Sequence, residues 1–335
     1  MAIKRMPIGI FVEGLILAEQ CKDGYIMGAR GQNPRKWSEN SWWFTQYDDD
    51  KDRYNKAIYW RNNAERVWDC NGLAEGLYEE YTGVNINTKA RYNYSDWCGI
   101  KGTGTIPVEY RVPGAAVFVH SASSGYITHV GYLEKPVDPS DPSGDWYIIE
   151  ARGVMYGVVR TKLNTKSRGW NRWGLMTKYF DYENTEIESS GFKTLRNGCE
   201  GEDVKKLQES LVRLGYDCGK YGADGDFGDA TEAALCKFQK DKNLTVNGVY
   251  NSQTAKALEA ALEGLDATVE NPTTVKIVGG QCYIRSEPNI SGEKIATAKE
   301  NSTHKFAGKI SDNGWIAILY KNKTCWVSGK YGRLM

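Results

Sequence analysis

An internal repeat in the second half of the chain constrains its fold more strongly than any other feature. The octapeptide at residues 224–231 recurs 23 residues later, at residues 247–254. Each copy joins a glycine suited to a tight turn, Gly225 or Gly248, to a polar residue suited to a helix start. Upstream, apolar residues spaced by three and four and ending at Gly215 predict one more amphipathic helix. The repeat therefore predicts three short helices.

The acidic residues of the first copy could be calcium ligands or local structural residues. Asp224, Asp226 and Asp229 lie close together, but the loop lacks the ligand ladder and the closing glutamate of an EF-hand. We interpret them as turn and cap residues, with Asp229 capping the next helix and Glu232 completing a capping box.

The repeat and its flanks resemble a known family. The Leu207-Gln208 and Phe238-Gln239 pairs, with the turn at Asp224-Gly225, resemble the peptidoglycan-binding domain of bacterial cell-wall hydrolases. The resemblance covers nearly the whole segment and implies bacterial peptidoglycan as a partner. A generic helical bundle is the alternative.

The last 60 residues alternate like short strands separated by turn residues. Six strands are expected, at residues 275–278, 282–285, 294–297, 304–307, 315–319 and 325–327, and they predict a small barrel. The run Tyr283-Ile284-Arg285, with Gly314-Trp315 and Trp326-Val327, resembles bacterial SH3-like cell-wall-targeting domains. Tyr283 replaces the usual asparagine of that family, and His304 is interpreted as a surface residue.

Two polar stretches, at residues 183–191 and 263–274, are typical of linkers. They divide the chain into segments 1–182, 192–263 and 274–335. The expected fold class is multidomain α+β, with a catalytic domain of helices plus antiparallel sheet, a three-helix domain and a small SH3-like barrel.

Charge and composition narrow the partners. The 43 Lys+Arg and 42 Asp+Glu residues nearly cancel, which argues against nucleic acid as the main partner. Three histidines and eight cysteines without a CxxC pair argue against a zinc site, so neither metal nor cofactor is expected. No window predicts membrane insertion, and residues 8–17 suit a helix better than a signal peptide because Glu13 interrupts them.

Cys70 is the cysteine with the most informative context. Leu73, Leu77 and Tyr81 recur at steps of four, which predicts a helix over 71–81 with Cys70 at its amino end. Free N–H groups and the helix dipole there favour a thiolate and can hold an oxyanion. A buried structural cysteine is the alternative on position alone.

A base and its partner are predicted from a hairpin. His129 lies on a strand over 125–133, sharing a face with Ile127, Gly131 and Leu133, and the glycine leaves room for an approaching group. The next strand, over 145–153, offers Glu150 beside the imidazole, where an acceptor fixes the tautomer. His120 is a weaker candidate for the base.

Taken together, these motifs fall in the order seen in the NlpC family of papain-like cysteine peptidases, which hydrolyse cell-wall amides. The resemblance covers most of residues 8–180 and implies Cys70 as nucleophile, His129 as base and Glu150 as the third polar residue. It also implies Tyr25 near the nucleophile. Three positions depart from the family pattern: Asn71 replaces a serine, Ala115 replaces an aspartate, and Glu150 stands where histidine is common.

About 40 residues separate the segment Tyr25–Gly28 from Cys70, and they are rich in aromatic side chains. They form either a cleft wall that stacks on glycan or stem peptide, or an accessory packing layer. The candidate cleft residues are Trp37, Trp42, Trp43 and Trp68, and Asn71 is a candidate oxyanion or substrate contact beside Tyr25.

The resemblances together imply a monomeric peptidoglycan hydrolase of the endolysin type that cuts a stem-peptide bond next to D-glutamate. The alternatives are an N-acetylmuramoyl-L-alanine amidase with the same triad, a muramidase and a catalytically inactive wall-binding protein. We expect synthesis in a host cytoplasm and action at the cell wall as a phage or prophage lysis protein, with a secreted wall enzyme as the alternative.

Overall fold

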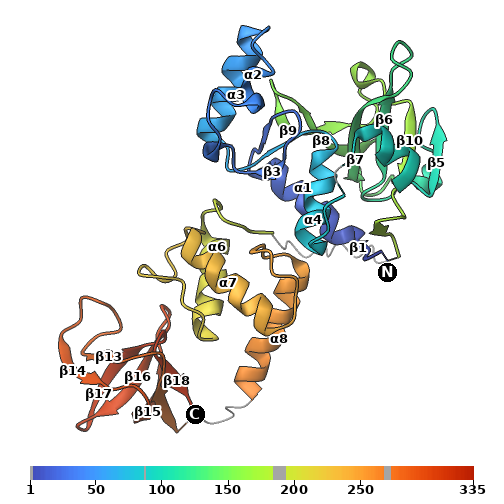
Figure 1. The fold of residues 1–335 in the computed structure, drawn as a ribbon. Coiled ribbons are helices and arrows are strands. Elements are labelled where there is room, and N and C mark those ends of the chain that lie inside the picture. Colours follow the sequence, from blue (N-terminus) through green and yellow to red (C-terminus); the bar gives the residue numbers. More distant parts are fainter. Residues whose placement is uncertain (1–2, 87, 184–193, 268–272) are drawn as a thin grey trace. The chain divides into compact units, whose positions relative to one another are not determined.

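The computed structural model describes residues 3–86, 88–183, 194–267 and 273–335 and divides the chain into two compact units, Met1–Thr194 and Leu195–Met335. Both units mix helices with antiparallel strands (Figure 1). The chain is thus α+β, as expected. The first predicted linker falls almost wholly outside the described residues, and the second begins later than predicted because its first residues continue a helix to Ala267.

The first unit combines short helices with a six-stranded sheet. Its helices are α1 (Ile8–Gln20), α2 (Trp42–Thr45), α3 (Lys51–Asn63), α4 (Gly72–Thr82) and α5 (Ala90–Tyr92). Its strands are β1 (Met6–Pro7), β2 (Gly24–Tyr25), β3 (Arg30–Gln32), β4 (Val67–Trp68), β5 (Ile100–Thr103), β6 (Ala116–His120), β7 (Ile127–Pro136), β8 (Trp146–Gly153), β9 (Gly157–Lys162), β10 (Arg172–Leu175) and β11 (Phe180–Asp181). Short turns η1 (Pro34–Lys36), η2 (Asn93–Trp97), η3 (Val108–Tyr110) and η4 (Lys166–Arg168) connect them.

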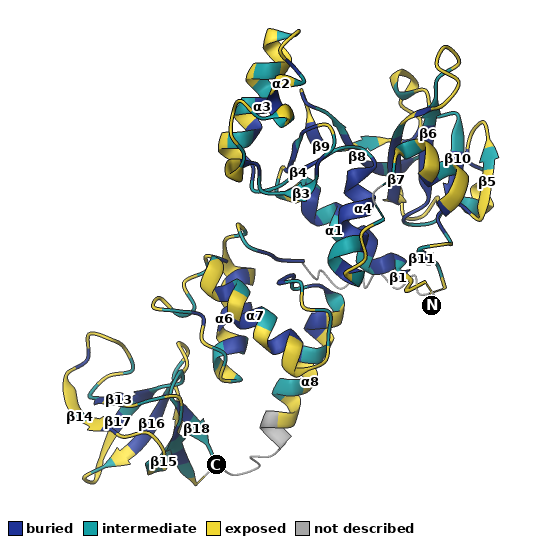
Figure 2. Cartoon of the chain, viewed as in Figure 1, coloured by how far each residue is buried: buried dark blue, intermediate teal, exposed yellow. Residues whose placement is uncertain are grey.

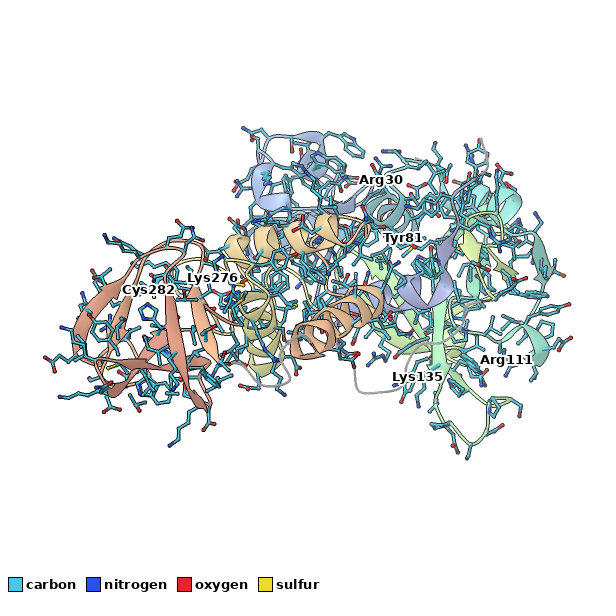
Figure 3. The ribbon with its side chains drawn as sticks, turned by 90° about the horizontal axis from the view of Figure 1, so that it is seen from below. Arg30, Tyr81, Arg111, Lys135, Lys276 and Cys282 are labelled. Carbon is cyan, nitrogen blue, oxygen red and sulfur yellow. The ribbon has the colours of Figure 1, made fainter. Side chains whose placement is uncertain are left out.

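The main sheet has the order β5-β10-β6-β7-β8-β9 with antiparallel neighbours. Helices α1 and α4 cover one face of it, and Phe11, Leu73 and Tyr132 share the buried cluster between them (Figure 2). The predicted helix over 71–81 and the strand pair carrying His129 and Glu150 are therefore confirmed. At the far end of the β7–β8 hairpin, Arg111 donates to the carbonyl oxygens of Ser143 and Gly144, and Figure 3 labels it with Lys135.

One detail of the β7 prediction is wrong. The pairing of β6 with β7 shifts between Val119 and His120, so a bulge interrupts the alternation before His129. Ile127 consequently packs in the cluster that contains Val130, on the opposite side of the strand from Leu133. The bulge arises from the way the two strands pair, so no periodic pattern in the sequence indicates it.

The aromatic-rich insertion forms its own small core. Phe44, Tyr47 and Trp60 are buried there, and the Trp60 indole donates to the Val154 carbonyl oxygen at 2.5 Å. The insertion rests against the three-stranded sheet β2-β4-β3, which leads directly into Cys70. Much of the insertion is therefore a packing layer.

The second unit begins with the three predicted helices, α6 (Glu202–Arg213), α7 (Asp229–Asp241) and α8 (Ser252–Ala267). Each copy of the repeat is held by a buried glutamine of the preceding helix. Gln208 accepts from the Gly225 N–H at 2.8 Å and donates to Thr231 at 2.9 Å, while Gln239 accepts from the Gly248 N–H at 3.0 Å. Because a buried amide must satisfy both its ends, these glutamines fix the turns.

The capping prediction for α7 is shifted by one position. The helix begins at Asp229, with Gly228 at the cap, and Asp229 and Glu232 both accept from the Asn197 amide at 2.8 and 2.7 Å. In the second copy the equivalent cap position is Asn251, which does accept from the Thr254 N–H at 2.9 Å. Asp224, by contrast, accepts from the Asp226 N–H as a turn residue should.

The rest of the second unit is one antiparallel sheet with the order β14-β13-β17-β16-β15-β12-β18. Its strands are β12 (Thr274–Ile277), β13 (Cys282–Arg285), β14 (Lys294–Ala298), β15 (Thr303–Ile310), β16 (Trp315–Tyr320), β17 (Lys323–Ser328) and β18 (Gly332–Leu334). The six predicted strands are all present, and β18 is an additional one. Val275, Ile284 and Val327 lie in its separate core.

Candidate active site

Cys70 lies in the turn between β4 and α4, and Asp69 organises that turn. One Asp69 oxygen accepts from the N–H groups of Asn71 and Gly72 at 3.0 and 2.6 Å, and the other accepts from Gly28 at 2.8 Å. A Cβ atom on Gly72 would collide with the Ala29 carbonyl oxygen, so only glycine allows α4 to start this close to the β2–β3 loop. Asp69 therefore positions Cys70 and also occupies the helix-start donors that the sequence assigned to an oxyanion.

The Cys70 sulfur lies against β7. The Val130 backbone lies close enough to act against the rise in the pKa of the Cys70 thiol, and the Tyr132 hydroxyl donates to the Cys70 carbonyl oxygen at 3.4 Å. These contacts place the thiol beside the residue that follows His129. Tyr25, on β2, lies close enough for its charge state to respond to Cys70 and Asp69, and burial raises its pKa. The structure thus brings Cys70, Tyr25 and the His129 strand together.

His129 and Glu150 are in direct contact. Their Nε2 and Oε2 atoms are 2.7 Å apart, the Glu150 side chain is fully buried, and Thr161 donates to its other oxygen at 2.8 Å. This is the contact predicted from the β7–β8 hairpin. His120, the weaker candidate, ends β6 with its backbone bound to Asn171.

Arg168 also belongs to this cluster, and the sequence analysis missed it. Its Nη2 atom is 2.9 Å from His129 Nε2 and donates to Glu150 Oε2 at close range. Trp170 stacks on His129 with ring centroids 5.6 Å apart and fills the space left by Gly131, which the sequence predicted for an approaching group. Arg168 is the last residue of the short η4 turn, which has no periodicity, so no local pattern could have identified it. Asp69 was detectable, because aspartate before a helix is a favoured cap.

The electrostatics of the site oppose a resting thiolate. Burial and the nearby Asp69 carboxylate raise the pKa of Cys70 to about 12. Burial, Arg168 and Arg152 lower the pKa of His129 to about 3, although Asp69 acts in the opposite direction. The free chain therefore holds a thiol beside a neutral imidazole, whereas the sequence predicted a thiolate favoured by the helix start.

The structure corrects the role expected for Asn71. Its side chain is buried, donates to Glu75 at 3.0 Å and accepts from the Asn93 amide at 3.0 Å. Glu75 in turn accepts from the Thr88 hydroxyl at 2.7 Å. The Asn71 side chain thus stabilises the first turn of α4 and is not accessible to a substrate.

The four candidate cleft tryptophans separate into three groups. Trp68 is fully buried and donates to Asp23 at 2.7 Å, so the expectation that it contacts substrate is wrong. Trp37 and Trp43 stack on each other, with centroids 4.1 Å apart. Trp42 is 58% exposed and packs edge-on against Trp43, next to the Gly28 turn that binds Asp69. Trp42 alone combines exposure with proximity to the Cys70 loop.

Comparison with known proteins identifies one segment of the chain. Residues 200–258 match the family described as "Putative peptidoglycan binding domain". This match confirms the resemblance drawn from the glutamine pairs and turns, and the chain carries a peptidoglycan-binding domain in its second unit.

Parts of the chain are also similar to curated proteins that are named as an amidase and as a cortex-lytic enzyme. The chain is 43% identical over 77 residues to a "Probable N-acetylmuramoyl-L-alanine amidase" of Bacillus licheniformis, covering 23% of this chain and 22% of that protein. It is 30% identical over 141 residues to a "Spore cortex-lytic enzyme" of Bacillus cereus, covering 42% and 48%. The chain therefore spans less than half the length of these relatives.

A solved structure, the SleB N-terminal domain, is 38% identical over 21% of this chain and 92% of that one, with a TM-score of 0.20. Among the described residues, no helix is long and apolar enough to span a bilayer. Within the same residues, no group of three or more His, Cys, Asp or Glu side chains could hold a metal ion.

Proposed function

We propose that the first unit is a cysteine-dependent hydrolase that cleaves an amide bond of bacterial peptidoglycan. One observation carries the proposal: strand β7 supplies His129, whose Nε2 is 2.7 Å from Glu150, and the same strand contacts Cys70 through Tyr132, whose hydroxyl donates to the Cys70 carbonyl oxygen. The second unit supports peptidoglycan as the polymer that is cut, because it carries the matched binding domain.

In the proposed mechanism His129 is a general base toward the Cys70 thiol, with Glu150 facing its Nε2 atom. Nδ1 takes the thiol proton as the sulfur attacks the amide carbonyl carbon. The resulting imidazolium protonates the leaving amine, and a thioester forms. His129 then deprotonates water, which attacks the thioester and releases a carboxylic acid and the Cys70 thiol.

The oxyanion of the tetrahedral intermediate needs donors other than the Asn71 and Gly72 N–H groups, since Asp69 occupies both. Neither Asp69 oxygen accepts from the Cys70 N–H, and the Tyr25 hydroxyl lies near Cys70 and Asp69. We assign this N–H and this hydroxyl as the oxyanion donors. Donors oriented before the reaction stabilise the developing charge most effectively.

The substrate proposal is a stem-peptide bond next to D-glutamate, with Trp42 stacking on the stem or glycan at the cleft edge. Tethering by the second unit raises the effective concentration of wall polymer at Cys70 and compensates for weak contacts at the cut bond. The same proposal includes action at the cell wall as a lysis protein of phage or prophage type.

A second candidate bond is the one between N-acetylmuramic acid and L-alanine. The curated relative at 43% identity is named as an amidase for this bond, which favours it. The two candidates use the same residues and differ in their products.

Mass spectrometry of digested peptidoglycan tests both bonds. An endopeptidase releases new amino groups inside the stem peptide, whereas an amidase frees intact stems from the glycan. Cys70→Ala should abolish the release of amines, and Cys21→Ala, a half-buried cysteine at the end of α1, is the matched control and should retain it. New reducing ends without amines would instead indicate a muramidase, and an unaffected Cys70→Ala protein would refute cysteine catalysis.

A further inference from the structure

Glu150 forms an ion pair with Arg168 next to His129. Glu150 is fully buried, and a buried carboxylate is costly unless a cation or several donors compensate it. In a simple Cys–His–carboxylate site the imidazolium can supply that charge. Here Arg168, 14% exposed, contacts the same Glu150 oxygen that faces His129 Nε2. Glu150 therefore has a permanent cation beside it before His129 takes up any proton.

Arg168 is held in this position from several sides. Its guanidinium lies over the Trp170 ring, 5.4 Å from the centroid, and Trp170 stacks on the His129 imidazole at an interplanar angle of 21°. Thr161 on β9 fixes the remaining Glu150 oxygen at 2.8 Å. Carboxylate, imidazole and guanidinium thus form one packed group built from β7, β8, β9 and the η4 turn.

The charged and titratable groups around His129 come from three places. Glu150 and Arg152 lie on β8, Arg168 on η4, and Asp69 and Cys70 on the loop before α4. Arg152 affects the imidazole electrostatically, and its guanidinium lies over the Tyr156 ring, 4.1 Å from the centroid. The two arginines therefore differ: both are cations near the ring, and Arg168 alone contacts Glu150.

We propose that Arg168 is a positioning residue that serves as the counterion of Glu150, so that Glu150 orients a neutral His129 ring instead of stabilising its imidazolium. This inference rests on the proposed role of Cys70 and His129 and deepens it. It implies that the site starts from a thiol and a neutral base and develops the ion pair only during attack. The lowered pKa of His129 agrees with this arrangement.

Alkylation of Cys70 by iodoacetamide tests the proposal without substrate turnover. The thiolate displaces iodide and forms a carbon–sulfur bond, so the rate reports the thiolate population. The reduced full-length protein is labelled between about pH 5 and about pH 9, and the Cys70 peptide is quantified by mass spectrometry because the chain has seven other cysteines. In the wild type the logarithm of the rate should rise with pH with a slope of about one, as for a simple thiol.

Arg168→Gln should change the shape of this profile. Without its counterion, Glu150 stabilises the imidazolium, and the ion pair with Cys70 adds a rate that is independent of pH. We expect alkylation near pH 6 to rise about tenfold, which corresponds to one pKa unit, and the slope to fall well below one. In turnover, the acid limb of kcat/KM should move to higher pH. Arg168→Lys, which keeps the charge, should restore part of the wild-type profile.

Two further variants keep the test decisive. Arg152→Gln removes a cation near the same ring without touching Glu150 and should shift the profile less. The double variant Glu150→Gln/Arg168→Gln removes both buried charges, so it protects the fold, and it should return to the thiol-like slope.

A profile for Arg168→Gln that superimposes on the wild type, or that equals the profile of Arg152→Gln, overturns the proposal. If the single variant does not fold, low-pH reactivity in the double variant overturns it, since no carboxylate is left to hold an imidazolium. Failure of the proposed function appears elsewhere, as retained hydrolysis by Cys70→Ala.

Discussion

The buried polar group around Glu150 and the buried glutamines of the helical repeat solve the same problem in different ways. Gln208 and Gln239 satisfy turns that lie 8 to 23 residues away in the chain, using neutral amides. His129, Glu150 and Arg168 are joined through ring and charged groups that lie 18 to 39 residues apart. The glutamine side chains bind nearby turns and stabilise the fold. The charged side chains of Glu150 and Arg168, which the sheet brings together, also influence the protonation of His129.

The largest expected effect comes from breaking the charged group. Glu150→Ala leaves the Arg168 guanidinium partly buried and uncompensated, which should lower the free energy of unfolding of the first unit by about 3–5 kcal/mol. Hydrolysis should fall by about a hundredfold or more because His129 loses its partner. Hydrogen exchange of β7 and β8 peptides in the full chain measures the first effect.

Glu134→Ala is a matched control for this prediction. Glu134 is also buried, on β7, and accepts from Arg160 at 2.7 Å. We expect it to lose stability while keeping its hydrolysis rate per folded molecule. Equal catalytic losses in the two variants would show that Glu150 acts only through folding.

The second-largest expected effect is that the stability of the first unit depends on pH. Folding lowers the pKa of His129 from its usual value to about 3, so below about pH 6.5 the unfolded chain binds a proton that the folded chain does not. Stability should therefore fall with decreasing pH, by at most about 1.4 kcal/mol per pH unit between those values.

Hydrogen exchange at several pH values separates this slope from that of the second unit. His129→Gln should flatten the slope in the first unit and leave the second unit unchanged. A slope that survives the substitution would assign the acid sensitivity to other groups.

The third effect tests the buried glutamines. Gln208→Ala strands the Gly225 N–H and the Thr231 hydroxyl, and Gln239→Ala strands the Gly248 N–H, so each should destabilise the helical part by about 2 kcal/mol. For Gln239→Ala the loss should be the same at mildly acidic and neutral pH because all its partners are uncharged. Gln208→Ala also removes a hydrogen bond that lowers the pKa of Asp224, so its loss should shrink in acid.

Gln208→Glu and Gln239→Glu sharpen this comparison. Gln208 donates to the Asp224 carboxylate, whereas Gln239 donates to the Asn247 amide oxygen, both at 2.9 Å. A glutamate at 208 should therefore cost more at neutral pH, and the difference should shrink in acid. Equal losses at all pH values would contradict the assigned contacts.

The smallest effect compares two threonines. Thr161 donates to the charged Glu150, and Thr231 accepts from the neutral Gln208 amide. Thr161→Val should cost about 1.5 kcal/mol or more, and Thr231→Val about 1 kcal/mol, since hydrogen bonds to charged groups are stronger. Hydrogen exchange of the two units in the same chain compares the losses directly, and the reverse order would contradict the distinction between the two regions.

Several features were accessible from the sequence because they depend on short-range periodicity. The helix that follows Cys70, the helices of the repeat and six strands of the last segment were all predicted from spacing and turn residues. The contact between His129 and Glu150 was predictable too, because consecutive strands joined by a short loop pair with each other.

Other features were predicted wrongly for identifiable reasons. The bulge before His129 put Ile127 on the other side of the strand. Residue type led us to predict a substrate contact for Asn71 and a cleft position for Trp68, but both side chains are buried. A thiolate was expected at the helix start because the effect of the Asp69 carboxylate, which raises the pKa of Cys70, was not considered.

Sequence alone determined the helix after Cys70, the helices of the repeat and six strands of the last segment, and it indicated that one segment is a peptidoglycan-binding domain. These features depend on helix periodicity, turns and glutamine contacts, which act over short stretches of chain. Only the tertiary structure decided the charge balance around His129. Arg168 reaches Glu150 from the short η4 turn, which lies 18 residues away in the chain and has no pattern of its own, and burial amplifies each charge there by excluding water. The protonation of a site depends on which charges share a dry volume, and that is a property of packing.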